Sequence, residues 1–113
     1  MGKNGALDPR GVAAASQAMP DAAGEQRIEQ KLESICSPVR VKILRALAQS
    51  DLAAGDLALV IGRSASATSQ HLRVLRDAGV VRAARTGNIV RYKLAEGFSP
   101  EMIASFAMQL DAA

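Results

Sequence analysis

The stretch DLALVIGRSASATSQHLRVLRDAGVV, residues 56–81, decides the fold that this sequence predicts. Leu57 to Ile61 is apolar enough for a short buried helix, and Gly62 ends that helix. Ser64 or Ser66 then provides an N-cap for a second, longer helix. Two helices joined by so tight a turn predict a helix–turn–helix.

The second helix of this motif has two unlike faces. One face is apolar, with Leu72, Leu75 and Ala78 at spacings of three. The opposite face carries hydroxyl, amide and guanidinium groups, with one carboxylate, from Ser66, Ser69, Gln70, Arg73 and Asp77. Most of these groups are ones that read base edges and phosphates in a DNA major groove. The pattern therefore favours a recognition helix over its alternative, a surface helix with a solvated polar face.

A β-hairpin is predicted directly after this helix. After Gly79, which tolerates the positive φ of a helix end, the apolar period changes from about 3.6 to about 2 residues. The strands expected from this change are Val80 to Arg85 and Ile89 to Leu94. Thr86-Gly87-Asn88 forms the turn, with Gly and Asn where positive φ is needed. A basic ribbon in this place is typical of a wing that lies over the DNA backbone or minor groove.

Positive charge is concentrated on the recognition helix and the wing. Residues 63–93 hold seven basic residues and one acidic residue, whereas the remainder holds seven basic and ten acidic ones, for a net charge of +3. This distribution predicts a polyanion-binding face, with a solvated basic face as the alternative. The expected DNA-binding residues are Ser64, Ser66, Thr68, Ser69, Gln70, His71, Arg73, Arg76, Arg85, Asn88 and Arg91.

Narrow apolar stripes mark the segments on either side of this motif, in Glu25–Cys36 and in the helix that starts at Ser99-Pro100. A chain of 113 residues has little core left to cover both stripes. We therefore expect them to pair with their copies across a two-fold axis, the alternative being that both fold onto their own core. The expected dimer interface is Ile28, Leu32, Ile35, Met102, Ile103, Phe106 and Leu110.

The remaining segments complete a mainly α fold with a small β-hairpin wing, a winged helix–turn–helix. Residues 1–22 are predicted to be a mobile N-terminal tail, and residues 23–113 the DNA-binding domain with its terminal dimerisation helices. Ser37-Pro38 is expected to start the most buried helix, which runs to about Gln49. On its outer side, Arg40, Lys42 and Arg45 are expected to be solvated, with phosphate contact as the alternative.

Three motifs lie within the span from Ile28 to Leu94: SPVRVKILRAL (37–47), DLALVIGRSASATSQHLRVLRDAGVV (56–81) and ARTGNIVRYKL (84–94). In these motifs the chain resembles the ArsR-type winged helix–turn–helix repressors. The resemblance implies a homodimer that binds a palindromic operator in double-stranded DNA and leaves it when an effector binds. It also implies that the recognition segment contains Ser66, Thr68, Ser69, Gln70, His71 and Arg73.

The chain departs from that family's pattern at the effector sites. Metal-sensing members carry a Cys-x-Cys motif where this chain has DLAAGD, residues 51–56. Others carry His and acidic ligands on the last helix, where this chain offers only Glu101 and Asp111. One cysteine and one histidine are too few for an ordinary soft-metal site, so we expect no metal and no cofactor. The effector is left unidentified.

Cys36, the only cysteine, has two interpretations. One is a small buried hydrophobic residue. The other is a reactive thiol that makes the protein a redox-responsive regulator, although redox-sensing relatives use two cysteines. A winged-helix module that binds another protein is a further alternative, because fold does not fix function.

Two classes of protein are not expected. The sequence offers no acid–base pair, phosphate loop or activated nucleophile, which argues against an enzyme. It also offers no run near the roughly 18 apolar residues of a membrane span and no secretory signal pattern. We therefore expect a cytoplasmic protein that does not associate with membranes.

Overall fold

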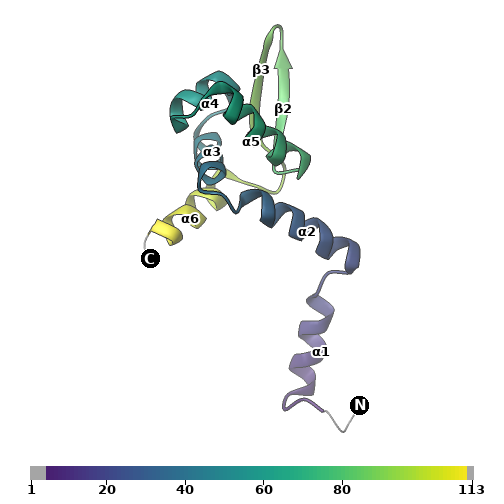
Figure 1. The fold of residues 1–113 in the computed structure, drawn as a ribbon. Helices are drawn as coiled ribbons and strands as arrows, with labels where there is room; N and C mark the ends of the chain where they lie inside the picture. Colours follow the sequence, from purple (N-terminus) through teal and green to yellow (C-terminus); the bar gives the residue numbers. More distant parts are fainter. Residues whose placement is uncertain (1–4, 112–113) are drawn as a thin grey trace.

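The computed structural model describes residues 5–111, with side chains described through Ser105. The elements in chain order are α1 (Pro9–Ala18), α2 (Ala22–Ile35), α3 (Pro38–Gln49), β1 (Leu52–Ala53), α4 (Ala54–Ile61), α5 (Ala65–Asp77), β2 (Val81–Thr86), β3 (Ile89–Leu94) and α6 (Pro100–Asp111). This is the predicted winged helix–turn–helix, in which α4 and α5 form the helix–turn–helix and β2 and β3 the wing (Figure 1).

Local capping signals define the helix–turn–helix. Gly62 ends α4 in the left-handed conformation, with φ 68°. The Ser64 hydroxyl then accepts a hydrogen bond from the Ala67 amide at 3.1 Å, so Ser64 is the N-cap of α5. At the other end of α5, the Val80 amide donates to the Leu75 carbonyl and the Gly79 amide to that of Arg76, both at 2.9 Å. This pair of bonds is a Schellman motif, and it requires the positive φ of Gly79.

The sheet has three strands in the order β1-β3-β2, all antiparallel. The short extended piece β1 adds to the predicted ribbon by pairing Leu52 with Tyr92. In the hairpin itself, Thr86 pairs with Ile89, which leaves a turn of Gly87 and Asn88. Only Gly87 has positive φ there, at 64°, so the expectation of positive φ at Asn88 is wrong. One positive φ at the first turn residue suits a type II′ turn.

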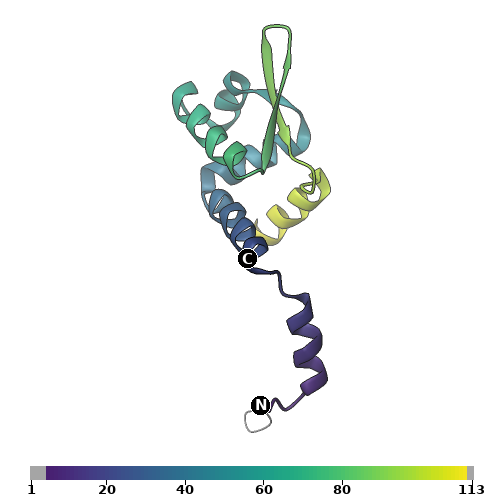
Figure 2. The same cartoon turned by 90° about the vertical axis from the view of Figure 1, so that its right-hand side faces the viewer.

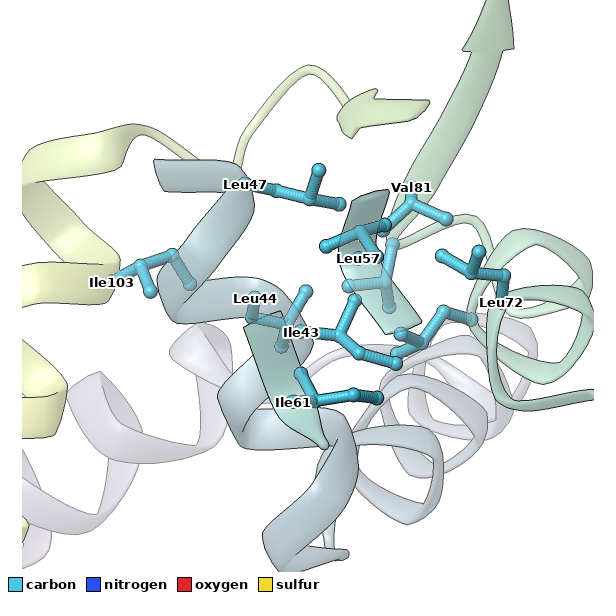
Figure 3. Close-up of a cluster of buried hydrophobic side chains, with 10 residues drawn as sticks. Ile43, Leu44, Leu47, Leu57, Ile61, Leu72, Val81 and Ile103 are labelled. Carbon is cyan, nitrogen blue, oxygen red and sulfur yellow. The ribbon is translucent and has the colours of Figure 1, made fainter. Parts of the chain in front are cut away.

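The core lies where α3, α4, α5 and the base of the wing meet. Its fully buried members include Ile43 from α3, Leu57 from α4, and Leu72 and Leu75 from α5. Figure 3 shows these side chains converging between the helices, with Ile103 of α6 on the other side of α3. As predicted, Ser37 and Pro38 begin α3, which buries Ile43, Leu44 and Leu47. The expectation that it is the most buried helix is not met, because the shorter α4 buries as many residues.

The molecule is elongated, with principal extents of 63 × 32 × 22 Å. The wing projects from one end and α1 forms the opposite end, while α2 and α6 lie between them, on the side of the body away from the wing (Figures 1 and 2). Residues 1–22 were expected to be a tail, yet α1 is helical because Asp8 caps it through the Gly11 amide at 3.0 Å and alanines follow. Every residue of α1 is exposed, and the division of the chain at residue 22 stays a prediction.

Candidate nucleic-acid interface

The outer face of α5 is as the sequence predicts. Leu72 and Leu75 are fully buried, and their burial fixes which side of the helix faces solvent. The exposed side therefore presents hydroxyl, amide and guanidinium groups together. The exposed members of the predicted set on α5 are Ser66, Ser69, Gln70, Arg73 and Arg76.

Thr68 does not belong to this surface, so its prediction as a DNA contact is wrong. Its side chain is 0% exposed, and its hydroxyl donates to the Ser64 carbonyl at 2.8 Å. The reason is helical periodicity, since Thr68 lies four residues before Leu72 and seven before Leu75, on the core side. A hydroxyl in that position helps to close the first turn of α5 and does not reach a base edge.

His71 is half-buried and faces the protein more than the solvent. Its Nδ1 accepts a hydrogen bond from Nε of Arg40, on α3, at 3.2 Å. Burial lowers the pKa of His71 below its usual 6.5, and the positive charges of Arg40 and Arg63 lower it further. The neutral imidazole is therefore favoured. His71 was expected among the DNA-binding residues, and in the structure its side chain instead joins α5 to α3.

Arg40 has a role that the sequence pattern did not predict. Besides His71, its Nη1 donates to the Ser34 carbonyl of α2 at 3.3 Å, and the residue is only half-exposed. The expected role was a solvated side chain or a phosphate contact. Arg40 lies three, four and seven residues before the buried Ile43, Leu44 and Leu47, so helical spacing places it toward the core side of α3. That spacing says nothing of a partner 31 residues away, so no local signal identifies the contact with His71.

The wing places further positive charge beside α5. Arg91 and Lys93 on β3 are exposed, whereas Tyr92 and Leu94 on the other face are half-buried against the core. Arg85 and Asn88 are also exposed, and the Arg85 Nε donates to the Gly87 carbonyl at 3.2 Å, which orders the side chain at the turn. Figure 1 shows the hairpin next to α5 and extending beyond it.

One basic residue of this region is already paired. Arg82 Nη1 lies 3.4 Å from a carboxylate oxygen of Glu96, and both side chains are largely exposed. An exposed pair of this kind contributes only about 0–1 kcal/mol, so a phosphate can compete for Arg82. The local excess of positive charge is therefore slightly smaller than the count over residues 63–93 suggests.

The apolar stripe of α2 is largely unburied in the single chain. Ile28 is 47% exposed and Leu32 is 54% exposed, while Ile35 is half-buried against the core. In α6, Met102 is 44% exposed, but Ile103 is only 9% exposed and packs on α3 within the core. Ile103 was expected at a dimer interface, and it instead holds α6 to its own chain. The expected interface residues Phe106 and Leu110 lie outside the residues whose side chains are described.

Cys36 ends α2 and is exposed, so its interpretation as a buried hydrophobic residue is wrong. It lies at the break before Ser37, where the chain cannot continue the helix into Pro38 and leaves the thiol on the outside.

Among the described residues, no group of three or more His, Cys, Asp and Glu side chains is placed to hold a metal ion. In the same part of the chain, no helix is long and apolar enough to cross a membrane.

The comparisons with known proteins agree with this geometry. The family model described as "Bacterial regulatory protein, arsR family" matches residues 37–83. Rv0081 from Mycobacterium tuberculosis is 31% identical to this chain in sequence, and its crystal structure matches with a TM-score of 0.63. The match covers 82% of this chain and 90% of Rv0081. The chain belongs to the ArsR family.

Two further proteins show a similar likeness. The solution structure of Mb0332 fragment 1–100 from Mycobacterium bovis is described as a homodimeric winged helix-turn-helix DNA-binding domain of a possible ArsR-family regulator. It is 25% identical, with a TM-score of 0.73, and the match covers 83% of this chain and 89% of that one. Among curated sequences, the transcriptional regulator NmtR of M. tuberculosis is 36% identical over 74 residues, which are 66% of this chain and 62% of NmtR.

The chain spans 64% of Rv0081 and 62% of NmtR, and only about half the length of the other curated relatives SmtB and KmtR. The match to the family model begins at residue 37 and ends at residue 83, just inside the wing. It therefore includes the whole helix–turn–helix. These relatives are named as transcriptional regulators, in agreement with the expectation that the chain is not an enzyme.

Proposed function

We propose that the protein is a sequence-specific DNA-binding transcriptional repressor. It binds a palindromic operator as a homodimer and is released by a signal other than an obvious metal. The observation that carries this proposal is the exposed face of α5, where base-reading and phosphate-binding groups stand together beside a basic hairpin. The names of the relatives, which are transcriptional regulators and repressors, support the same conclusion.

The side chains of this surface divide into two chemical roles. Serine hydroxyls and the Gln70 amide suit base edges, where a good contact discriminates by about 1–3 kcal/mol. Guanidinium groups suit phosphates, and each phosphate neutralised makes the affinity more salt-dependent. The proposed base contacts are Ser66, Ser69 and Gln70, and the proposed phosphate contacts are Arg73, Arg76, Arg85 and Arg91.

A homodimer explains the apolar side chains that α2 and α6 leave exposed. Ile28, Leu32 and Met102 are each at least 44% exposed, and their helices lie at the end of the winged body away from the wing tip (Figure 2). Two subunits joined at this end would present two α5 helices to one face of DNA. The half-sites are then expected about 34–36 Å apart, one helical turn of DNA. The homodimeric state described for Mb0332 supports this arrangement.

A binding selection followed by a salt titration tests the proposal. The protein selects an operator from random duplexes, and fluorescence anisotropy then measures its affinity at several salt concentrations. Gln70→Ala should relax sequence preference with little change in salt dependence. Arg73→Ala with Arg91→Ala should instead weaken binding to all duplexes and lower the salt slope by about 4, because the dimer loses four phosphate contacts.

Arg10→Ala is the matched control, because Arg10 is an equally exposed arginine on α1, far from α5. It removes the same charge and should leave the affinity for the operator nearly unchanged. If wild-type protein selects no sequence, the proposal is wrong. If the double arginine variant binds DNA as wild type does, the proposed surface is wrong and a protein-binding module becomes the better interpretation.

A redox-responsive regulator is a second candidate, favoured by the exposure of Cys36 between α2 and α3. Two such thiols, one from each subunit, can form a disulfide when an oxidant such as diamide takes up their two protons and two electrons. The oxidant should then change operator affinity in wild type but not in Cys36→Ser. An equal response in both proteins would remove this candidate.

A further inference from the structure

Arg40 links the helix proposed for dimerisation to the recognition helix. Its side chain starts in the first turn of α3 and donates in two directions, to the Ser34 carbonyl of α2 at 3.3 Å and to Nδ1 of His71 in α5 at 3.2 Å. Its own amide donates to the Ser37 cap at 3.4 Å, which anchors the residue at the start of α3. One guanidinium thus bridges three helices, and we call this set of contacts the Arg40 bridge.

The partners of the bridge suit a guanidinium. The Ser34 carbonyl lies in the last turn of α2, where carbonyl groups lack partners within the helix and the helix dipole is negative. The imidazole nitrogen accepts only while it carries no proton, and the lowered pKa of His71 favours that state. Because guanidinium nitrogens lie in one rigid plane, the two bonds together fix the direction between α2 and α5.

Part of the boundary between α2 and α5 is open. A cleft of about 460 Å³ lies there, lined by side chains that include Gln30, Ser34, Arg40 and Val74. A further contact that ties α2 to the body is that of Lys31, whose ammonium lies 5.9 Å from the centroid of the Phe98 ring. A cation–π contact on a flexible stem tethers a helix without fixing its angle. The Arg40 bridge is therefore the contact best suited to set that angle.

We propose that Arg40 is a positioning residue for operator recognition. By holding α2 and α5 at one angle, it sets the distance between the two α5 helices of a dimer and so the half-site spacing that the dimer accepts. This inference rests on the proposed function, because it assumes that α2 pairs two subunits and that α5 contacts DNA. It differs from a phosphate contact in that it affects the match to paired half-sites and not the affinity for one half-site.

The test measures affinity for a series of operators whose half-site separation differs by single base pairs, and for a single half-site. Arg40→Lys keeps the charge and loses the planar fork. We expect it to lower affinity at the best spacing about tenfold, which equals about 1.4 kcal/mol, and to flatten the preference among spacings. Half-site affinity should stay within about twofold, because no group of the α5 surface changes.

Variants of His71 test the same bond from the other side. His71→Phe keeps a ring and loses the acceptor, so it should flatten the spacing preference as Arg40→Lys does. His71→Asn keeps an acceptor near the place of Nδ1 and should retain the preference. The double variant Arg40→Lys with His71→Phe should be no worse than Arg40→Lys alone, because Arg40→Lys already removes the bond that His71→Phe removes. Arg27→Lys is the control, since Arg27 is exposed on α2 outside the bridge, and it should behave as wild type.

Thermal unfolding and sedimentation of each variant show whether the fold and the dimer are intact. If Arg40→Lys unfolds, the contrast between His71→Phe and His71→Asn still tests the bond. An unchanged spacing preference in a folded Arg40→Lys dimer overturns the inference and leaves the proposed function standing. An equal loss on half-sites and paired sites, with a lower salt slope, overturns it in favour of a direct phosphate contact. Failure of the wild type to bind any duplex overturns the proposed function itself.

Discussion

The winged body from α3 to β3 and the terminal helices α1 and α2 use apolar residues in opposite ways. In the body, Ile43, Leu57, Leu72 and Leu75 are all 0% exposed. In α2, the two central residues of the apolar stripe, Ile28 and Leu32, keep about half of their surface in water, at 47% and 54% exposed. The body therefore buries a core of its own, although Leu59 and Val60 of α4 stay exposed, whereas α2 leaves most of its apolar stripe for another surface.

The difference has a physical origin in how many elements meet. Each body residue faces neighbours on several sides, because α3, α4, α5 and the hairpin surround one centre (Figure 3). Helix α2 touches the body along one edge, so a stripe on its outer side cannot be covered from within one chain. Substitutions in the core of the body should therefore lower the free energy of unfolding. Substitutions in the exposed stripe of α2 should instead weaken association between subunits.

The largest effect is expected for Leu75→Ala in the body. Removing a fully buried leucine leaves a cavity, and we expect the free energy of unfolding to fall by about 2–5 kcal/mol. Val74→Ala is the control, since the neighbouring Val74 is 37% exposed and should cost well under half as much. Urea denaturation followed by circular dichroism measures both. Equal losses would mean that the body is not the single packed core described above.

The next largest effect is expected for Leu32→Asp in α2, and on association rather than folding. A leucine that becomes buried in a dimer contributes about 1.5–3 kcal/mol, and a carboxylate there must also lose water. We expect dimer dissociation to rise at least tenfold in sedimentation equilibrium. Leu59→Asp is the control, because Leu59 is 82% exposed on α4, away from the stripe, and should leave the mass unchanged. A Leu32→Asp protein that stays fully dimeric contradicts the proposed interface.

Features that depend on a few neighbouring residues could be predicted from the sequence. Ser37-Pro38, Gly62 and Gly79 mark helix ends through backbone rules that act within one turn, and each mark was confirmed. The exposed face of α5 was predicted for the same reason, since a period of 3.6 residues separates it from the buried face. The hairpin followed from the change of period and one glycine turn.

Features that depend on distant parts of the chain could not be predicted. Ile103 shares its stripe with Met102, and only the position of α3 decides that Ile103 is the one that becomes buried. The contact between Arg40 and His71 joins residues 31 positions apart, and nothing near either one in the sequence indicates the other. Thr68 was wrong for a simpler reason, because its hydroxyl was given more weight than its place on the core side of α5.

A smaller effect tests the local backbone rules in the body. Gly62→Ala forces an alanine into the left-handed region and should lower the free energy of unfolding by about 1–2 kcal/mol. Gly55→Ala is the matched opposite, because Gly55 lies in the first turn of α4 with no atom near a new Cβ. It should be neutral or stabilising by about 0.4–1 kcal/mol. If both changes act with the same sign in thermal unfolding, the turn does not require Gly62.

A still smaller effect is expected from pH at the junction of the two regions. Because the folded pKa of His71 lies below 6.5, its contribution to stability is complete above pH 6.5 and is lost as the pH falls through the folded pKa. The chain has one histidine, so a single imidazole NMR signal reports that pKa directly. Arg40→Met should move the pKa of His71 upward, by removing a nearby positive charge. A signal that titrates above 6.5 in the wild type would contradict the contact with Arg40.

The smallest effect is expected from removing residues 1–19. The result shows whether α1 contributes to the stability of the rest of the protein. Every described residue of this segment is exposed, including Val12 and Met19, so its removal uncovers almost no buried surface. The free energy of unfolding should change by no more than about 0.5 kcal/mol, as for surface changes in general.

A deletion through Cys36 is the contrast, since it also removes Ile35 and the Ser34 carbonyl and should destabilise the body. A loss above about 1 kcal/mol on removing residues 1–19 alone would show that α1 packs on a surface, because unpacked surface residues rarely contribute so much. The exposed stripe of α2 would then be the first surface to test as its partner.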